Sequence, residues 1–183
     1  MALSDELEPI LAAAEALASS GERLTGVLAA EPLAFGRVYL CAFASDSGHT
    51  WLALDANATP VTSRDAVREA AQLAALCEVA EDAAGGGRLP ELRERLRELR
   101  ETEAPEGIEE AEEAARVLAE TLESEPRLAS TDYLDRLGSA ARRLEQSLGD
   151  DAGSPFAAAM QQALPAVEEL AADVERTYKG PLA

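Results

Sequence analysis

The chain has 183 residues, of which 47% are apolar and only 4% aromatic, and its net charge is −19 at pH 7. Nucleic acid is excluded as a partner because a phosphate backbone requires a basic face, and no run of about 20 apolar residues is present that could span a bilayer. The length suits one domain or two small ones. With so few aromatic residues, the core must consist of Leu, Ala and Val, which favours closely packed helices.

The acidity is most simply interpreted as a solvated surface that keeps an Ala-rich protein soluble. Attraction of a basic partner and adaptation to a salty cytoplasm are the alternatives. The start of the chain has no basic segment of the kind that opens a signal peptide. Two cysteines without such a signal predict free thiols and a cytoplasmic location.

Residues 3–17 predict an amphipathic helix, because apolar residues recur at steps of three and four. Ser19-Ser20-Gly21 ends it. Residues 22–34 are ambiguous and predict either a short helix or a loop, closed by Pro32.

Residues 37–58 predict a β-hairpin. The run from Val38 to Phe43 is β-branched, aromatic and apolar throughout, which is typical of a strand buried on both faces. A turn sequence follows at residues 46–48, and Trp51–Asp55 resumes the strand pattern.

Five further stretches have the spacing of amphipathic helices. Pro165 lies inside the last and should kink it or split it near Gln162, while Ser154-Pro155 is a strong helix start. These stretches are residues 65–82, 89–99, 108–122, 134–148 and 156–174.

The fold class is therefore α+β and predominantly α: a bundle of about six helices with one β-hairpin at residues 37–58. We expect an N-terminal helix–hairpin–helix part at residues 1–84 and a four-helix part at residues 88–183. The two parts pack as a single domain, with Gly85–Gly87 as the connection. An isolated hairpin is marginal in water, so the helix at 65–82 should cover it. A second chain could also supply strands, which predicts a homodimer.

The sequence contains none of the common catalytic, phosphate-binding or metal-binding motifs, so no catalytic residue, metal ligand or cofactor is assigned. Polar and aromatic residues gather instead on the hairpin, and loops on rigid scaffolds often carry function. The candidate ligand or partner contacts are Tyr39, Cys41, Asp46, His49, Trp51 and Asp55.

Cys41 and His49 are the only pair that suggests nucleophilic catalysis, which needs hydrogen-bond reach. If residues 47–48 form the turn, His49 lies opposite Asp46 and Cys41 opposite Leu54, several residues apart along the strand. We therefore interpret the histidine as a polar turn residue and the cysteine as a small core residue.

The leading hypothesis is a non-catalytic cytoplasmic protein-interaction or adaptor module. A small-molecule binder or enzyme with a pocket between hairpin and bundle is one alternative. An acidic chaperone-like holdase with a basic or apolar protein client is another, on an analogy of charge and size.

Overall fold

The computed structural model describes residues 3–86, 88–102, 106–124, 128–149 and 153–183. The chain forms two compact units. The first, here the sheet unit, comprises Met1–Ala75, Pro126–Thr131 and Pro165–Ala183. The second, the helical unit, comprises Leu76–Glu125 and Asp132–Leu164.

The sheet unit is built on a mixed sheet with the strand order β3-β2-β1-β4. β1, β2 and β3 are antiparallel neighbours, whereas β4 runs parallel to β1. The strands span Arg23–Glu31 (β1), Val38–Ser45 (β2), Gly48–Asp55 (β3) and Leu128–Ser130 (β4).

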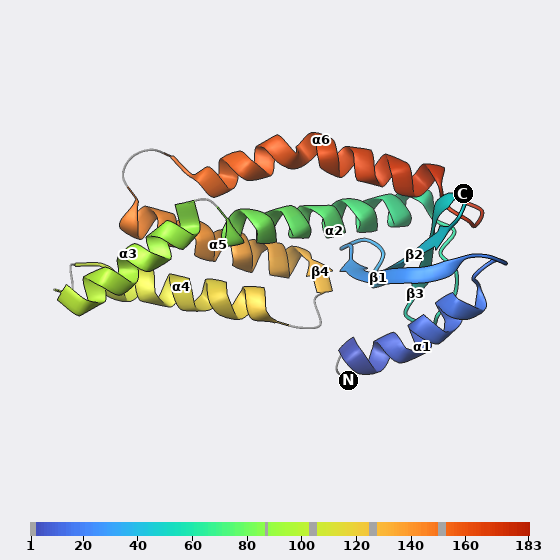
Figure 1. The fold of residues 1–183 in the computed structure, drawn as a ribbon, viewed down its shortest axis with the longest axis horizontal. Coiled ribbons are helices and arrows are strands. Elements are labelled where there is room, and N and C mark those ends of the chain that lie inside the picture. Colours follow the sequence, from blue (N-terminus) through green and yellow to red (C-terminus); the bar gives the residue numbers. More distant parts are fainter. Residues whose placement is uncertain (1–2, 87, 103–105, 125–127, 150–152) are drawn as a thin grey trace. The chain divides into compact units, whose positions relative to one another are not determined.

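Both faces of the sheet are covered by helices. α1 (Leu3–Ala16) packs Ile10 and Ala14 onto one face, here the α1 face, and Figure 1 shows it lying along β1. α2 (Arg64–Gly85) and α6 (Pro155–Arg176) contribute Val67 and Val174 to the core on the opposite face. The predicted cover of the hairpin by the helix at 65–82 is confirmed, and so is a β2 strand buried on both sides.

The predicted β-hairpin is confirmed as β2 and β3, but its register differs from the expectation. Ser45 pairs with Gly48, so the turn is formed by Asp46 and Ser47. Cys41 consequently lies opposite Leu52 and not opposite Leu54.

The expectation of a single hairpin is wrong, because β1 and β4 add two strands from the same chain. β1 lies where a short helix or loop was expected. It contains Gly26 and two alanines, which favour strands weakly, and a bulge between Leu24 and Gly26 breaks its alternation. β4 has only three residues and carries no recognisable pattern.

The helical unit contains α3 (Arg88–Thr102), α4 (Ile108–Glu123), α5 (Thr131–Leu148) and parts of α2 and α6. The amphipathic helices predicted for this part of the chain are confirmed, and the apolar side of each helix buries mostly Leu and Ala. Large buried residues of this unit are Leu89, Leu92, Leu96, Ile108, Leu118, Leu137, Leu144 and Phe156.

α6 begins at Pro155 as predicted, and the hydroxyl of Ser154 accepts a hydrogen bond from the Ala157 N–H at 3.1 Å. The side chain of Glu145, only 4% exposed, caps the same end of α6 by accepting a hydrogen bond from the Phe156 N–H at 3.0 Å. A carboxylate at a helix N-terminus offsets the cost of its burial. Of the two effects expected of Pro165, a kink or a split near Gln162, the split does not occur, because α6 continues through Pro165.

The described residues form six helices. None of these is both long and apolar enough to cross a bilayer. The division between the two units passes through two helices, after Ala75 in α2 and after Leu164 in α6. The predicted connection at Gly85–Gly87 follows at the end of α2, and Gly87 lies outside the described residues.

Candidate functional site

The six hairpin residues predicted as contacts do not converge on one site. Tyr39 and Cys41 are fully buried beneath α1, whereas Trp51 packs on the opposite face. Asp46 lies exposed in the turn. Asp55, at the far end of β3, accepts hydrogen bonds from backbone N–H groups of the loop that follows.

Cys41 and His49 lie in different environments. Burial raises the pKa of the Cys41 thiol to about 12, so the reactive thiolate does not form at neutral pH. His49 lies near the tip of the hairpin, and its Nε2 is 2.7 Å from Oδ2 of Asp173 on α6. The two side chains therefore have no shared chemistry.

Tyr39 instead belongs to a polar cluster that fastens α1 to the sheet. Its hydroxyl donates to Glu6 of α1 at 2.9 Å, and Arg37 bridges Glu6 and Glu31. The hydrogen bonds from Tyr39 and then from Arg37 lower the pKa of Glu6. All the charges of this cluster are paired within it, which indicates a structural role.

The outer edge of β3 is closed by two other segments. The C-terminal residues run beside Trp51. The backbone N–H of Trp51 donates to the Thr177 carbonyl at 3.1 Å, and the backbone carbonyl of Trp51 accepts from the Lys179 N–H at 2.8 Å. The loop after β3 closes the rest: the Asp55 N–H donates to Thr59 at 2.9 Å.

Tyr178 completes this closure from the C-terminal segment. Its hydroxyl accepts a hydrogen bond from the Ala53 N–H at 3.1 Å and donates one to the Val61 carbonyl at 2.6 Å. The Val61 N–H in turn donates to the Ala53 carbonyl at 2.8 Å. From Trp51 to Asp55, the outward backbone N–H groups on this edge are therefore all bonded.

Lys179 anchors the same segment through its side chain. Its ammonium lies 2.5 Å from Glu22, 2.9 Å from the Leu17 carbonyl and 4.2 Å from the centroid of the Phe43 ring. The hydrogen bonds from Lys179 and then from the Ser19 N–H lower the pKa of Glu22 to about 2.

The outer edge of β1, in contrast, is largely open. The parallel ladder with β4 covers only Ala29–Glu31. For Arg23–Leu28, no backbone hydrogen bond reaches the outer edge from any other segment that the structure describes. A row of unpaired N–H and C=O groups of this kind is a template for another strand.

The side chains of this open edge alternate between the two faces of the sheet. Leu24 and Val27 are half-buried on the α1 face. Arg23 and Leu28 lie on the opposite face, opposite Ala44 and Leu40, and Leu28 is 45% exposed. The edge thus offers apolar surface as well as backbone groups.

A bulge at Thr25 makes this edge less regular. The Thr25 hydroxyl donates to the Ala42 carbonyl at 3.1 Å, which holds the extra residue against β2. An isolated glycine within an otherwise strand-like run, as at Gly26, is the signal from which the strand and its bulge could have been predicted.

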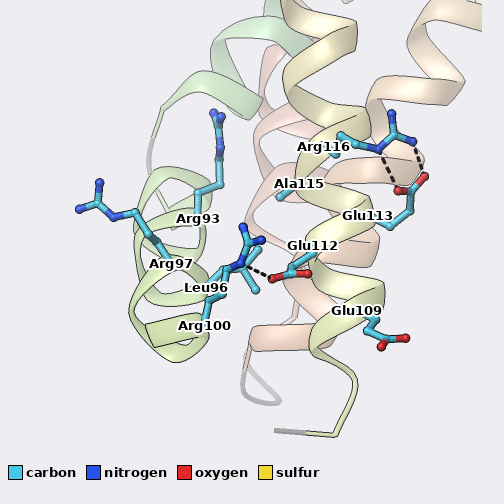
Figure 2. A pocket seen from close by; sticks show the side chains of 9 residues that line it. All are labelled: Arg93, Leu96, Arg97, Arg100, Glu109, Glu112, Glu113, Ala115 and Arg116. Carbon is cyan, nitrogen blue, oxygen red and sulfur yellow. Dashed lines mark hydrogen bonds and ion pairs between the residues drawn. The ribbon is translucent and has the colours of Figure 1, made fainter. Parts of the chain in front are cut away.

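A separate groove of about 520 Å³ lies in the helical unit between α3 and α4 (Figure 2). Its charges largely neutralise one another: Arg100 pairs with Glu112 at 3.3 Å and Arg116 with Glu113 at 2.6 Å, and Figure 2 shows Arg97 pointing away from α4. Without a convergent set of one charge, the groove indicates no particular ligand. Its lining residues are Arg93, Leu96, Arg97, Arg100, Glu109, Glu112, Glu113, Ala115 and Arg116.

Among the residues that the structure describes, no group of three or more His, Cys, Asp and Glu side chains is placed to hold a metal ion. No known protein family, curated protein or solved structure matches the chain. The functional interpretation therefore depends on the geometry alone.

Proposed function

We propose that this protein is a non-catalytic protein-interaction module that takes up an extended segment of a partner protein by strand addition to β1. The observation that carries the proposal is the unequal treatment of the two outer edges of one sheet. The loop after β3 and the C-terminal segment close the outer edge of β3 from Trp51 to Asp55. The outer edge of Arg23–Leu28, in contrast, is unpaired in the described part of the chain. Main-chain hydrogen bonds along such an edge supply affinity, and the alternate side chains supply specificity.

The environments of the hairpin residues favour this proposal over an enzyme. The Cys41 thiol is held protonated by burial, and His49 is engaged with Asp173. Tyr39 and Trp51 are used for packing on opposite faces of the sheet. These residues supply no shared cleft in which a substrate would meet a nucleophile and a base.

The proposal can be tested by selecting binders from a phage-displayed library of random linear peptides. A selected peptide, added to the isotope-labelled protein, should perturb and protect backbone amides within Arg23–Leu28 in NMR spectra. Amides at Trp51–Asp55 should change little, because their partners are already in place. The absence of any enriched peptide, or binding that maps to the α3–α4 groove, would overturn the proposal.

Two exposed leucines provide a matched pair of variants. Leu28, 45% exposed on β1, should tolerate Leu28→Lys in the folded state, but a charge at the edge should abolish strand addition. Leu164, 51% exposed on α6, serves as the control, and Leu164→Lys should leave binding unchanged.

We also propose a homodimer, as expected from the sequence. The need of the hairpin for strands from a second chain no longer supports it, because the hairpin receives strands from its own chain. Light scattering at micromolar concentration separates monomer from dimer. A cytoplasmic location is proposed because the buried Cys41 thiol takes part in no disulfide. The net charge of −19 argues against nucleic acid as the partner.

A further inference from the structure

Resting on the proposed function, we infer that the partner segment is basic: an extended peptide in which Lys or Arg alternates with apolar residues. Strand addition alone would accept many sequences, because the backbone groups of every extended segment are the same. The charges and apolar side chains around the open edge of β1 decide which sequences fit.

The helix that covers the α1 face of the sheet carries negative charge only. α1 contains four acidic residues and no basic one. Glu6 is engaged with Arg37 and Tyr39. Asp5, Glu8 and Glu15 are exposed and make no ion pair with any described residue. Cations brought to this side of the sheet would therefore meet unneutralised carboxylates, in a chain whose overall charge already attracts them.

The alternation of β1 fixes which positions of the added strand should be basic. Side chains on the α1 face would lie beside Leu24 and Val27, so the aliphatic part of a Lys or Arg could cover these residues while its charged end reaches toward α1. Positions on the other face would lie beside Leu28 and Arg23. Exposed Leu28 favours an apolar neighbour there, and Arg23 disfavours a basic one.

A second copy of this chain is the competing occupant of the edge. Two chains with a net charge of −19 each repel one another, and pairing β1 with itself would bring no basic side chain to the carboxylates of α1 apart from Arg23. Charge complementarity thus favours a basic partner over self-association.

The library selection described above also tests this inference. Enriched peptides should carry Lys or Arg at every second position with apolar residues between. A peptide of identical composition, with its basic residues shuffled out of alternation, should bind more weakly. Combined Glu8→Gln and Glu15→Gln substitutions should weaken binding of the alternating peptide roughly two- to ten-fold and reduce its salt dependence.

Combined Glu69→Gln and Glu169→Gln substitutions are the matched control, because both residues are exposed acids in the same unit, on α2 and α6, away from the α1 face. Equal losses for both variants, or equal affinity for the shuffled peptide, would reveal non-specific attraction to an acidic protein and overturn the inference. Enriched peptides without basic residues, or dimerisation through β1, would also overturn it. Peptides mapping to β1 without charge preference would leave the proposed function intact, whereas the absence of any binder would remove both.

Discussion

The two outer edges of the sheet are handled in opposite ways. β3 is eight residues long, and its edge from Trp51 to Asp55 is closed by residues 59–61 of the loop that follows it and by residues 177–179 of the C-terminal segment. β1 is nine residues long, yet β4 pairs with only three of them. Proteins usually protect edges because exposed strands aggregate. Within the described residues, the C-terminal segment helps to close one edge, whereas part of the other edge is open and interrupted by a bulge, so the capacity for pairing is concentrated at one place.

The largest expected difference concerns two leucines that face each other across β1 and β2. Leu40 is 1% exposed, and Leu40→Ala should cost about 2–5 kcal/mol of unfolding free energy because a cavity remains. Its register partner Leu28 is 45% exposed at the open edge, and Leu28→Ala should cost less than about 1 kcal/mol. Urea unfolding measures both. Similar losses would show that the edge at Leu28 is covered.

The ion pair that anchors the closed edge should depend on pH. Lys179→Met should cost about 1.5–3 kcal/mol at pH 7, as expected for a hydrogen bond between charged groups, because Glu22 and Lys179 are only 11% and 13% exposed. The pKa of Glu22 lies at about 2 in the folded state, below its ordinary 4.5, so this stabilisation is complete above about pH 4.5 and is lost toward pH 2.

Unfolding curves of the native protein and the Lys179→Met variant should therefore approach one another as the solution is acidified. A difference in stability that stays constant from pH 7 to pH 2 would contradict the assignment of the Glu22 pKa to this pair.

The hydroxyl of Tyr178 should matter more than a hydroxyl on the open edge. Tyr178→Phe should cost about 1–2 kcal/mol and speed hydrogen exchange at Ala53, because it leaves the Ala53 N–H and the Val61 carbonyl without their partner. Thr25→Val, which removes a hydrogen bond at the exposed edge of β1, should change stability by less than about 0.5 kcal/mol. A larger loss of stability for Thr25→Val than for Tyr178→Phe would show that the edge of β1, and not that of β3, is the closed one.

A small effect of the opposite sign is expected at Gly26. Gly26 has an ordinary negative φ, and a Cβ atom built on it meets nothing within 4 Å. Gly26→Ala should therefore raise stability by about 0.5 kcal/mol, since alanine loses less conformational freedom on folding. A destabilised variant would indicate that another segment approaches the backbone closely at this point.

Much of the fold could be predicted from apolar spacing. The apolar spacing of residues 134–148 and 156–174 predicted helices correctly, and Leu137 and Val167 within them are buried. The β-branched and aromatic run of β2 predicted a strand covered on both faces. β1 was not predicted as a strand, because its bulge interrupts the two-residue alternation of side chains on which strand prediction depends. The hairpin register was two residues off because the turn uses Asp46 and Ser47 ahead of Gly48.

The candidate site was much less predictable than the fold. An open edge is a property of which strands pair, and pairing between β1 and a three-residue β4 about a hundred residues later leaves no local pattern. The closure of β3 likewise depends on contacts such as Lys179 with Glu22, 157 residues apart. Tyr39 and Trp51 of the hairpin were predicted as ligand or partner contacts because aromatic residues are rare in this chain. In the structure they pack against the sheet's covering helices instead.

The anchoring of the C-terminal segment has a practical consequence, because Lys179 is the only lysine in the chain. Its side chain is 13% exposed and its amine is paired with Glu22. Acylating reagents, and enzymes that conjugate groups to lysine, can therefore modify the amine readily only after the segment detaches. The rate of amine labelling at Lys179 therefore reports how often the seal on β3 opens.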